Sequence, residues 1–186
     1  DRRHKFAQWL VNADNPYFAR IEANRIWSQF FARGIVDPID DFRESNPPAN
    51  EPLLDALAKD FVDSGFDRKH LIRVILNSRT YQASYQSNDS NRDDHIYFSH
   101  QEPRLLDAEQ LLDAINQSLG LTQTYGNLPP GTKATQLPAP DIVKVNFLKV
   151  FGQPDRMTVC ACERAGESNL AMAIELFNGA ELHKKL

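Results

Sequence analysis

The sequence predicts a mainly α, compact multi-helix domain with long loops and room for one small β-hairpin near residues 121–150. Three observations support this fold class. Apolar residues recur at the i, i+3, i+4, i+7 spacing of a helix face through the first two thirds of the chain. Asn, Asp and Gly stand where these stretches would begin and end. The last third is richer in Gly, Pro and Thr, which is typical of loops.

Two helices are predicted at the start of the chain. The first spans residues 4–13, and we expect its apolar face to be buried. This face consists of Phe6, Trp9, Leu10 and Ala13. The second helix runs from Pro16 to about Arg33, with Asn15 as its N-cap and Gly34 as its stop. Its apolar residues are Phe18, Ile21, Ile26, Trp27, Phe30 and Phe31.

Three further helices follow a loop at residues 35–50. Asn50 is the predicted cap of the third helix, which Gly65 ends, and Asp67 is the predicted cap of the fourth. A fifth helix begins at Asp107. The three apolar faces are Leu54, Leu57, Ala58 and Phe61; Leu71, Ile72, Ile75 and Leu76; and Ala108, Leu111, Leu112, Ile115 and Leu119.

The chain changes character after residue 119. The composition of residues 120–140 predicts a long loop or a weak hairpin. Val143, Val145 and Phe147 alternate with polar residues, which predicts a short strand. A final helix is predicted from about Ser168, and its apolar face consists of Leu170, Ala173, Ile174 and Phe177.

Length and composition limit the class of protein. The 186 residues suffice for one domain, so we predict a single helical domain over residues 1–186. The net charge of −4, with acidic and basic residues interspersed, argues against nucleic acid as a partner. No apolar run approaches the roughly 18 residues that a membrane span needs. The chain opens without methionine and closes inside a predicted helix, so we expect a fragment of a longer multidomain protein.

Cys160 and Cys162 are the only cysteines, one residue apart. Structural zinc sites usually combine two Cys pairs or add nearby histidines, and neither is present here, so no metal site is favoured. A disulfide between the two would close a very small, strained ring. We favour two free thiols and keep the metal site and the disulfide as alternatives.

Two groups of charged and polar residues are candidates for a site or for anchoring loops. Glu22, Asn24 and Arg25 interrupt the apolar second helix, and Glu22 and Arg25 are spaced to form an ion pair. We expect this group to hold the loop at residues 35–50, and we expect that loop to meet residues 152–167. The complete set of candidates is Glu22, Asn24, Arg25, Asp40, Asp41, Arg43, Glu163 and Arg164.

The sequence contains none of the catalytic motifs that we considered. The aspartates of DPIDDF could bind calcium, but they lack the spacing of an EF-hand loop. No nucleophile elbow, phosphate-binding loop or zinc-protease motif is present, so no catalytic residue is assigned. For Glu163 and Arg164, a structural role is favoured over ligand binding.

Three segments together resemble one family. They run from Asn15 to Ser84, from Pro103 to Ile115 and from Phe151 to Gly179, and they occur in the family's order. The chain resembles the PSD domain, also called domain of unknown function 1553, a C-terminal module of planctomycete-type proteins that carry cytochrome-c-like domains. The resemblance implies an extracytoplasmic protein. It implies no cofactor in this domain and haem c, where present, on another domain of the parent.

Three hypotheses for function follow. We favour a non-catalytic binding or interaction module of an exported multidomain protein that docks other domains of its parent, such as a cytochrome-c-like module, or binds polysaccharide. Exposed aromatic residues would support sugar binding, although ordinary packing is the simpler interpretation of each. The candidates are Tyr81, Tyr85, Tyr97 and Phe98. The alternatives are an enzyme domain acting on polysaccharide and a purely structural spacer.

Overall fold

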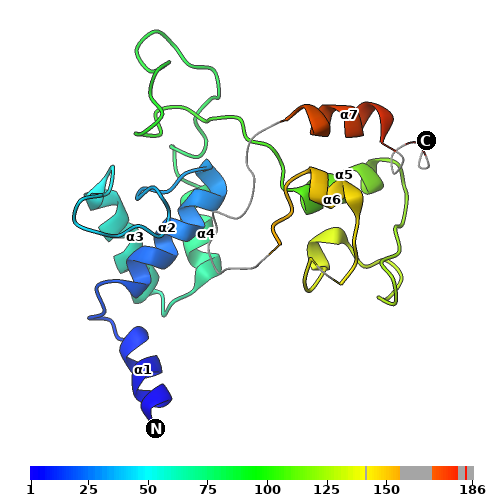
Figure 1. Ribbon diagram of the computed structural model, residues 1–186. Helices are drawn as coiled ribbons and strands as arrows, with labels where there is room; N and C mark the ends of the chain where they lie inside the picture. Colours follow the sequence, from blue (N-terminus) through cyan, green and yellow to red (C-terminus); the bar gives the residue numbers. More distant parts are fainter. Residues whose placement is uncertain (141, 156–168, 180–182, 184–186) are drawn as a thin grey trace. The chain divides into compact units, whose positions relative to one another are not determined.

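A computed structural model describes residues 1–140, 142–155, 169–179 and 183 of the chain. These residues form seven α-helices and one short 3₁₀ helix, with no strand among them (Figure 1). The mainly α prediction is therefore confirmed. The elements are α1 (Arg2–Leu10), α2 (Phe18–Phe31), α3 (Glu51–Asp63), α4 (Arg68–Leu76), α5 (Ala108–Ser118), η1 (Ala134–Gln136), α6 (Asn146–Val150) and α7 (Leu170–Asn178).

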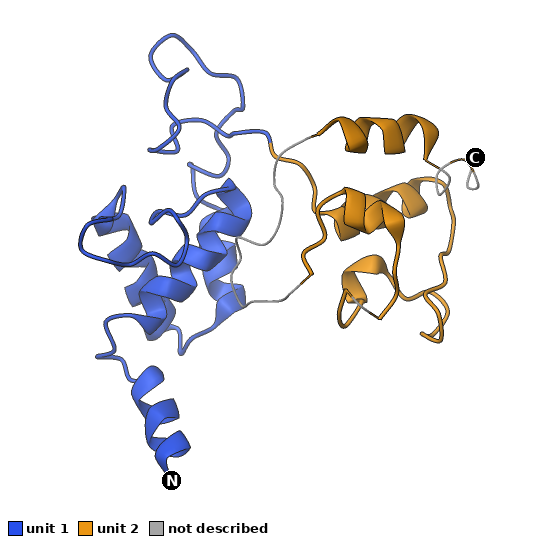
Figure 2. Cartoon of the chain, in the orientation of Figure 1, with its two compact units in different colours: residues 1–103 blue, residues 104–186 orange. Residues whose placement is uncertain are grey.

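The helices divide between two compact units. Unit 1 comprises residues 1–103 and unit 2 comprises residues 104–186 (Figure 2). Each unit has its own cluster of buried apolar side chains. The single helical domain over residues 1–186 stays a prediction.

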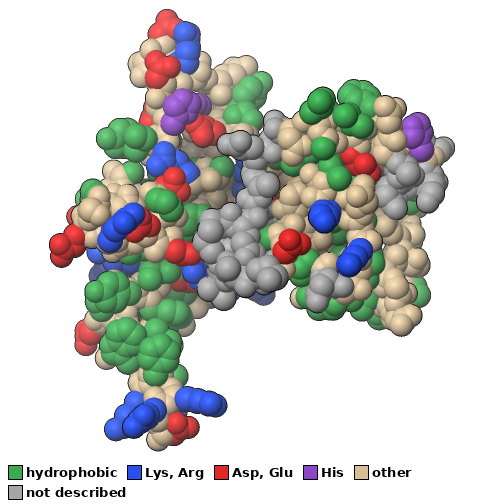
Figure 3. Space-filling view, viewed as in Figure 1, with side chains coloured by type: hydrophobic (Ala, Val, Ile, Leu, Met, Phe, Trp, Pro, Cys, Tyr) green, Lys and Arg blue, Asp and Glu red, His purple; other side chains and the backbone are tan. Residues whose placement is uncertain are grey.

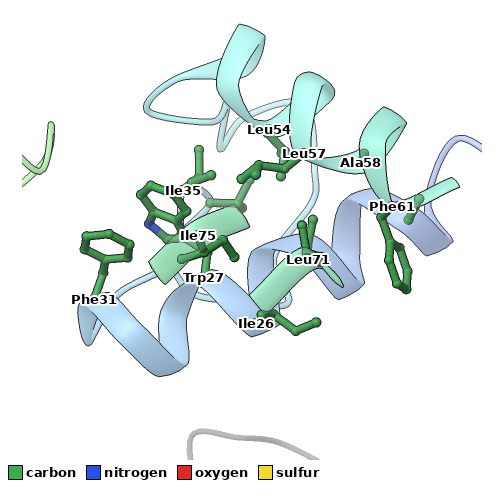
Figure 4. Close-up of a cluster of buried hydrophobic side chains, with 13 residues drawn as sticks. Ile26, Trp27, Phe31, Ile35, Leu54, Leu57, Ala58, Phe61, Leu71 and Ile75 are labelled. Atoms are coloured by element: carbon green, nitrogen blue, oxygen red, sulfur yellow. The ribbon is translucent and has the colours of Figure 1, made fainter. Parts of the chain in front are cut away.

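The core of unit 1 lies among α2, α3 and α4 (Figure 4). Trp27 of α2 is its largest buried side chain and stacks on Phe31 with ring centroids 4.1 Å apart. Phe98, from the loop after α4, meets Trp27 edge-on at 5.2 Å. Removing this apolar surface from water is the main stabilising contribution, at roughly 25 cal/mol per Å². The other labelled core residues are Ile26, Ile35, Leu54, Leu57, Ala58, Phe61, Leu71 and Ile75.

The predicted caps of α3 and α4 are confirmed. Asn50 Oδ1 accepts a hydrogen bond from the Leu53 amide at 3.1 Å. Asp67 Oδ1 accepts from the amides of Lys69 and His70 at 2.8 and 3.1 Å. Each side chain accepts from backbone amides of the first helical turn, which have no partner within the helix. This is why an Asn or Asp ahead of an apolar run predicted where each helix begins.

Helix α2 ends differently from the prediction. Its C-cap is Ala32, which adopts a left-handed φ of 63°. Gly34 is therefore not the residue that stops the helix. It serves a different purpose, because a Cβ at this position would lie 2.1 Å from the Val36 carbonyl oxygen and 2.7 Å from Asn24 Nδ2. The glycine permits a close approach of the chain to α2.

Helix α1 forms where a helix was predicted, but its apolar face is not buried. Phe6 and Trp9 are 59% and 49% exposed, and no residue of the helix is buried. The spacing correctly predicted a helix. The expectation that this face joins the core is wrong, because no other helix of unit 1 covers it.

Unit 2 packs α5, η1, α6 and α7 around a smaller core. Phe147 and Leu148 are both fully buried, and Phe147 stacks on Phe151 with centroids 4.3 Å apart. Adjacent buried residues and a contact four residues on suit a helical turn rather than a strand with one buried face. The described residues between 121 and 150 accordingly contain η1 and α6, and the small hairpin does not form among them.

Helix α7 also exposes the face that was expected to be buried. Leu170, Ile174 and Phe177 are 75%, 53% and 81% exposed, whereas Met172 is buried in the core of unit 2. Asn169 caps the helix by accepting from the Met172 amide at 3.0 Å. The helix is therefore apolar on both its buried and its exposed side.

Candidate functional site

Asn24 is the centre of the candidate group in unit 1. Its side chain lies on α2, is 0% exposed, and binds the backbone of the loop that follows the helix. Its Nδ2 donates to the carbonyls of Val36 and Ile39 at 2.9 and 2.8 Å, and its Oδ1 accepts from the Val36 amide at 3.0 Å. One buried amide thus satisfies three backbone groups and holds the loop against the helix.

The rest of this loop is held by further contacts of the same kind. Asn46 Nδ2 donates to the carbonyls of Asp37 and Asp41 at 3.2 and 2.9 Å. The Ala49 amide donates to the Ile35 carbonyl at 2.7 Å, which ties the end of the loop to its beginning. The loop therefore follows a path fixed by bonds to its own backbone.

Arg25 pairs with the loop rather than with Glu22. Its Nε donates to Asp40 Oδ1 at 2.7 Å. This hydrogen bond is the main cause of a raised pKa for the Arg25 guanidinium, with smaller contributions from the negative charges of Asp40 and Glu22. The pair is partly exposed, so we expect it to contribute at most about 1 kcal/mol to stability.

The remaining described candidates are paired elsewhere. Glu22 Oε1 lies 2.7 Å from Arg68 Nε at the start of α4. Arg43 donates to Asp41 Oδ2 at 2.6 Å within the loop. The structure therefore brings Asn24, Arg25 and Asp40 together and directs Glu22 towards a different helix. All six described candidates are engaged with protein groups.

The second group of candidates lies outside the described residues. Glu163, Arg164, Cys160 and Cys162 fall within residues 156–168, and so does most of the segment expected to meet the loop at 35–50. Among the residues that the structure does describe, no group of three or more His, Cys, Asp or Glu side chains is placed to hold a metal ion.

Two hollows on the described surface are lined by other residues. One, of about 250 Å³, lies in unit 2 against the start of α5 and η1. The other, of about 10 Å³, lies in unit 1 beside the end of α2. None of Glu22, Asn24, Arg25, Asp40, Asp41 or Arg43 lines either hollow.

A protein-family model matches this chain over residues 2–186. The matching family is described as PSD1: Protein of unknown function (DUF1553). The chain belongs to the PSD1 family. The predicted resemblance is thus confirmed over both units. No curated protein and no solved structure matches this chain.

One charged cluster of this PSD1 chain was missed by sequence reasoning. It lies in the loop after α4, where Asp94 accepts from the amides of Ile96, Tyr97 and Ser99 at 3.0, 2.7 and 3.0 Å. Hydrogen bonds to Ser99 and to these amides hold the pKa of Asp94 far below its ordinary value. An aspartate that bonds amides two and three residues ahead is a common turn signal, and DDHIYFS contains it.

His95 and Arg33 complete this cluster. His95 Nδ1 lies 2.5 Å from Glu102 Oε1, and this hydrogen bond is the main cause of the raised pKa of His95. Arg33 donates to the His95 carbonyl from the segment just after α2. These contacts hold the loop over the aromatic end of α2, where Phe98 packs on Trp27.

The four aromatic residues proposed for sugar binding divide into two pairs. Tyr81 packs edge-on against Phe30 and Phe31, and Phe98 packs in the core. Tyr85 and Tyr97 are largely exposed. In the described part of the PSD1 chain, none of the helices is both long and apolar enough to cross a membrane.

Proposed function

We propose that this PSD1 domain is a non-catalytic interaction module of an exported multidomain protein, and that its partners are other domains of the same polypeptide. The observation that carries the proposal is the outward face of α7. Leu170, Ile174 and Phe177 recur at i, i+4 and i+7 and are exposed on a helix that Met172 anchors in the core of unit 2. Contiguous exposed apolar faces of this kind are characteristic of interaction surfaces.

The state of the charged candidates supports a non-catalytic role. An enzyme acting on polysaccharide would need acids and bases that converge on a hollow where substrate can bind. The described candidates instead pair with one another, with Arg68 or with loop backbone. A purely structural spacer would have no use for an exposed apolar helix face, so the interaction module is preferred to the spacer.

The family resemblance supports one kind of partner. In this proposal the parent is of the planctomycete type and works outside the cytoplasm. A cytochrome-c-like domain of that parent is the favoured docking partner. Haem c would be held by that domain, and this chain would contribute only the surface that receives it.

A titration tests the proposal. The remaining domains of the parent protein are titrated into this chain by calorimetry, with Phe177→Ser as the variant and Tyr97→Ser as a matched exposed control. Binding should weaken about tenfold or more in the Phe177 variant, because the complex loses an aromatic side chain that the partner would bury, and should be unchanged in the control. If no parent domain binds the unaltered chain, the proposal is wrong.

Polysaccharide binding is a second candidate, favoured by the exposure of Tyr85 and Tyr97. Aromatic rings that stand in solvent can stack on sugar faces, and these two contribute little to the core. A glycan array probed with this chain and with Tyr85→Ala and Tyr97→Ala variants tests this function. Signals that both variants abolish would support it, and an array without signals would exclude it for the glycans displayed.

A further inference from the structure

Helix α1 presents a mixed basic and aromatic stripe to solvent. Arg2, Lys5, Phe6 and Trp9 recur at i, i+3, i+4 and i+7, so they share one face of the helix. We call these four residues the α1 stripe. In the space-filling view, basic side chains gather at the N-terminal end of α1 and hydrophobic side chains lie next to them (Figure 3).

The two aromatic rings of the α1 stripe contact each other. Phe6 and Trp9 stack with ring centroids 5.9 Å apart and an interplanar angle of 25°. About half of each side chain is exposed. The two rings together present one continuous aromatic surface that a partner could cover.

Hydrogen bonds of one side chain connect the end of α1 to the beginning of α2. Asn15 is buried between the two helices, and its Nδ2 donates to the Trp9 carbonyl at 3.0 Å. Its Oδ1 accepts from the amides of Tyr17 and Phe18 at 2.9 and 3.0 Å. One side chain thus joins the end of α1 to the beginning of α2.

The exposed surface of α1 combines apolar and positively charged side chains. The helix buries none of its residues, and Asp1 caps it by accepting from the Arg3 amide at 3.1 Å. Arg2, Arg3 and Lys5 follow this cap, so basic groups outnumber acidic ones at this end of the helix. An apolar surface that bears carboxylates would complement both the aromatic rings and the positive charges.

We propose that the α1 stripe docks into an apolar pocket flanked by Asp or Glu on another folded domain of the parent protein. The proposal rests on the function proposed above and adds α1 to α7 as a second element that makes contact with another domain. Phe6 and Trp9 enter the pocket, and Arg2 and Lys5 pair with its carboxylates. The fixed direction of α1 favours a folded protein over a lipid surface, because a fluid surface gains nothing from a preset angle.

The test is photo-crosslinking in the full parent polypeptide. p-Benzoylphenylalanine replaces Phe6 in one sample, Phe177 in a second and Tyr97 in a third. Crosslinked peptides are then identified by mass spectrometry. Position 6 should link to another domain, at a peptide that combines apolar residues with Asp or Glu.

Charge reversal tests the chemistry of the pocket. The triple variant Arg2→Glu, Lys5→Glu and Arg3→Glu should lower the yield from position 6 by roughly fivefold or more, the equivalent of one exposed ion pair. Arg79→Glu, at an exposed arginine elsewhere in unit 1, is the matched control and should have no effect. Since α1 buries no residue, the unfolding midpoint reports on the core of unit 1 alone, and unchanged helix content by circular dichroism should show that α1 remains folded in the variant.

The outcomes separate this proposal from the proposed function. Links from position 177 or 97 to other domains, with position 6 linked only within residues 1–186, to lipid or to nothing, would overturn the docking of α1 and leave the interaction module intact. No link to another domain from any of the three positions would overturn both. A yield from position 6 that charge reversal leaves unchanged would exclude the acidic pocket.

Discussion

Helices α1 and α2 lie next to each other in the sequence and have similar apolar spacing, but their surroundings differ. Half of the residues of α2 are buried, and none of the residues of α1 is. The difference comes from their neighbours, since α3, α4 and the loop carrying Phe98 all pack on α2. Periodic apolar residues thus predict that a helix forms, whereas burial depends on which other elements the chain supplies.

Truncation of Trp27 should produce the largest effect. Trp27→Ala removes the largest buried side chain of unit 1 together with its contacts to Phe31 and Phe98. We expect the free energy of unfolding to fall by about 3–5 kcal/mol in urea denaturation. A loss below about 1 kcal/mol would show that α2 is no more essential than α1.

Asn24 should come next, because it links α2 to its loop. Asn24→Ala leaves the Val36 amide and the carbonyls of Val36 and Ile39 without their side-chain partner. We expect a loss of about 3 kcal/mol and faster hydrogen exchange at the Val36 amide. Asn77→Ala, which removes one exposed bond to the Arg73 carbonyl, is the control and should cost less than about 1 kcal/mol.

A smaller effect should appear with pH, at the loop that covers the aromatic end of α2. The hydrogen bond to Glu102 raises the folded-state pKa of His95, so the folded chain favours the protonated ring. This contribution is fully present below the ordinary pKa of 6.5 and is lost as the pH rises through the higher folded value. The temperature midpoint of unfolding should therefore decrease slightly as the pH is raised above neutrality.

Two variants check the origin of that pH dependence. His95→Gln and Glu102→Gln should each remove the slope, because either one eliminates the ionised pair. A slope that persists in both variants would assign the pH dependence to other groups.

The smallest effect is expected on α1. Phe6→Ala and Trp9→Ala should each change the free energy of unfolding by less than about 0.5 kcal/mol, since neither side chain is buried. Trp9→Ala and Trp27→Ala form a matched pair, the same substitution on two adjacent helices. A loss above 2 kcal/mol at Trp9, measured in the same urea titration, would mean that α1 is covered in solution.

Much of the helical fold could be predicted from local chemistry. Asn50 and Asp67 located the starts of α3 and α4 because a cap bonds amides only two or three residues away. The exposure of Phe6 and Phe177 could not be predicted, because burial depends on residues distant in the sequence. The same limit explains α6, where contacts of Phe147 with Phe151 override an alternating pattern.

The candidate site was only partly accessible to sequence reasoning. A polar Asn24 within an apolar helix indicated a buried anchor, and the length of the following loop indicated what it holds. The pairing of Glu22 with Arg68 had no sequence signal, because it joins two helices across 46 positions. Gly34 was assigned to the end of a helix, whereas the close approach of the Val36 carbonyl and the Asn24 side chain requires it.

The way Asn24 holds its loop has a consequence for how this sequence can change over evolution. Its three bonds go to main-chain atoms of Val36 and Ile39, which every amino acid except proline can provide in full. Asp113 of α5 binds the amides of Ala134 and Thr135 in a similar manner. Substitutions at loop positions whose side chains make no such bond can therefore accumulate without altering the course of the chain, provided that Asn24, Asn46 and Asp113 persist.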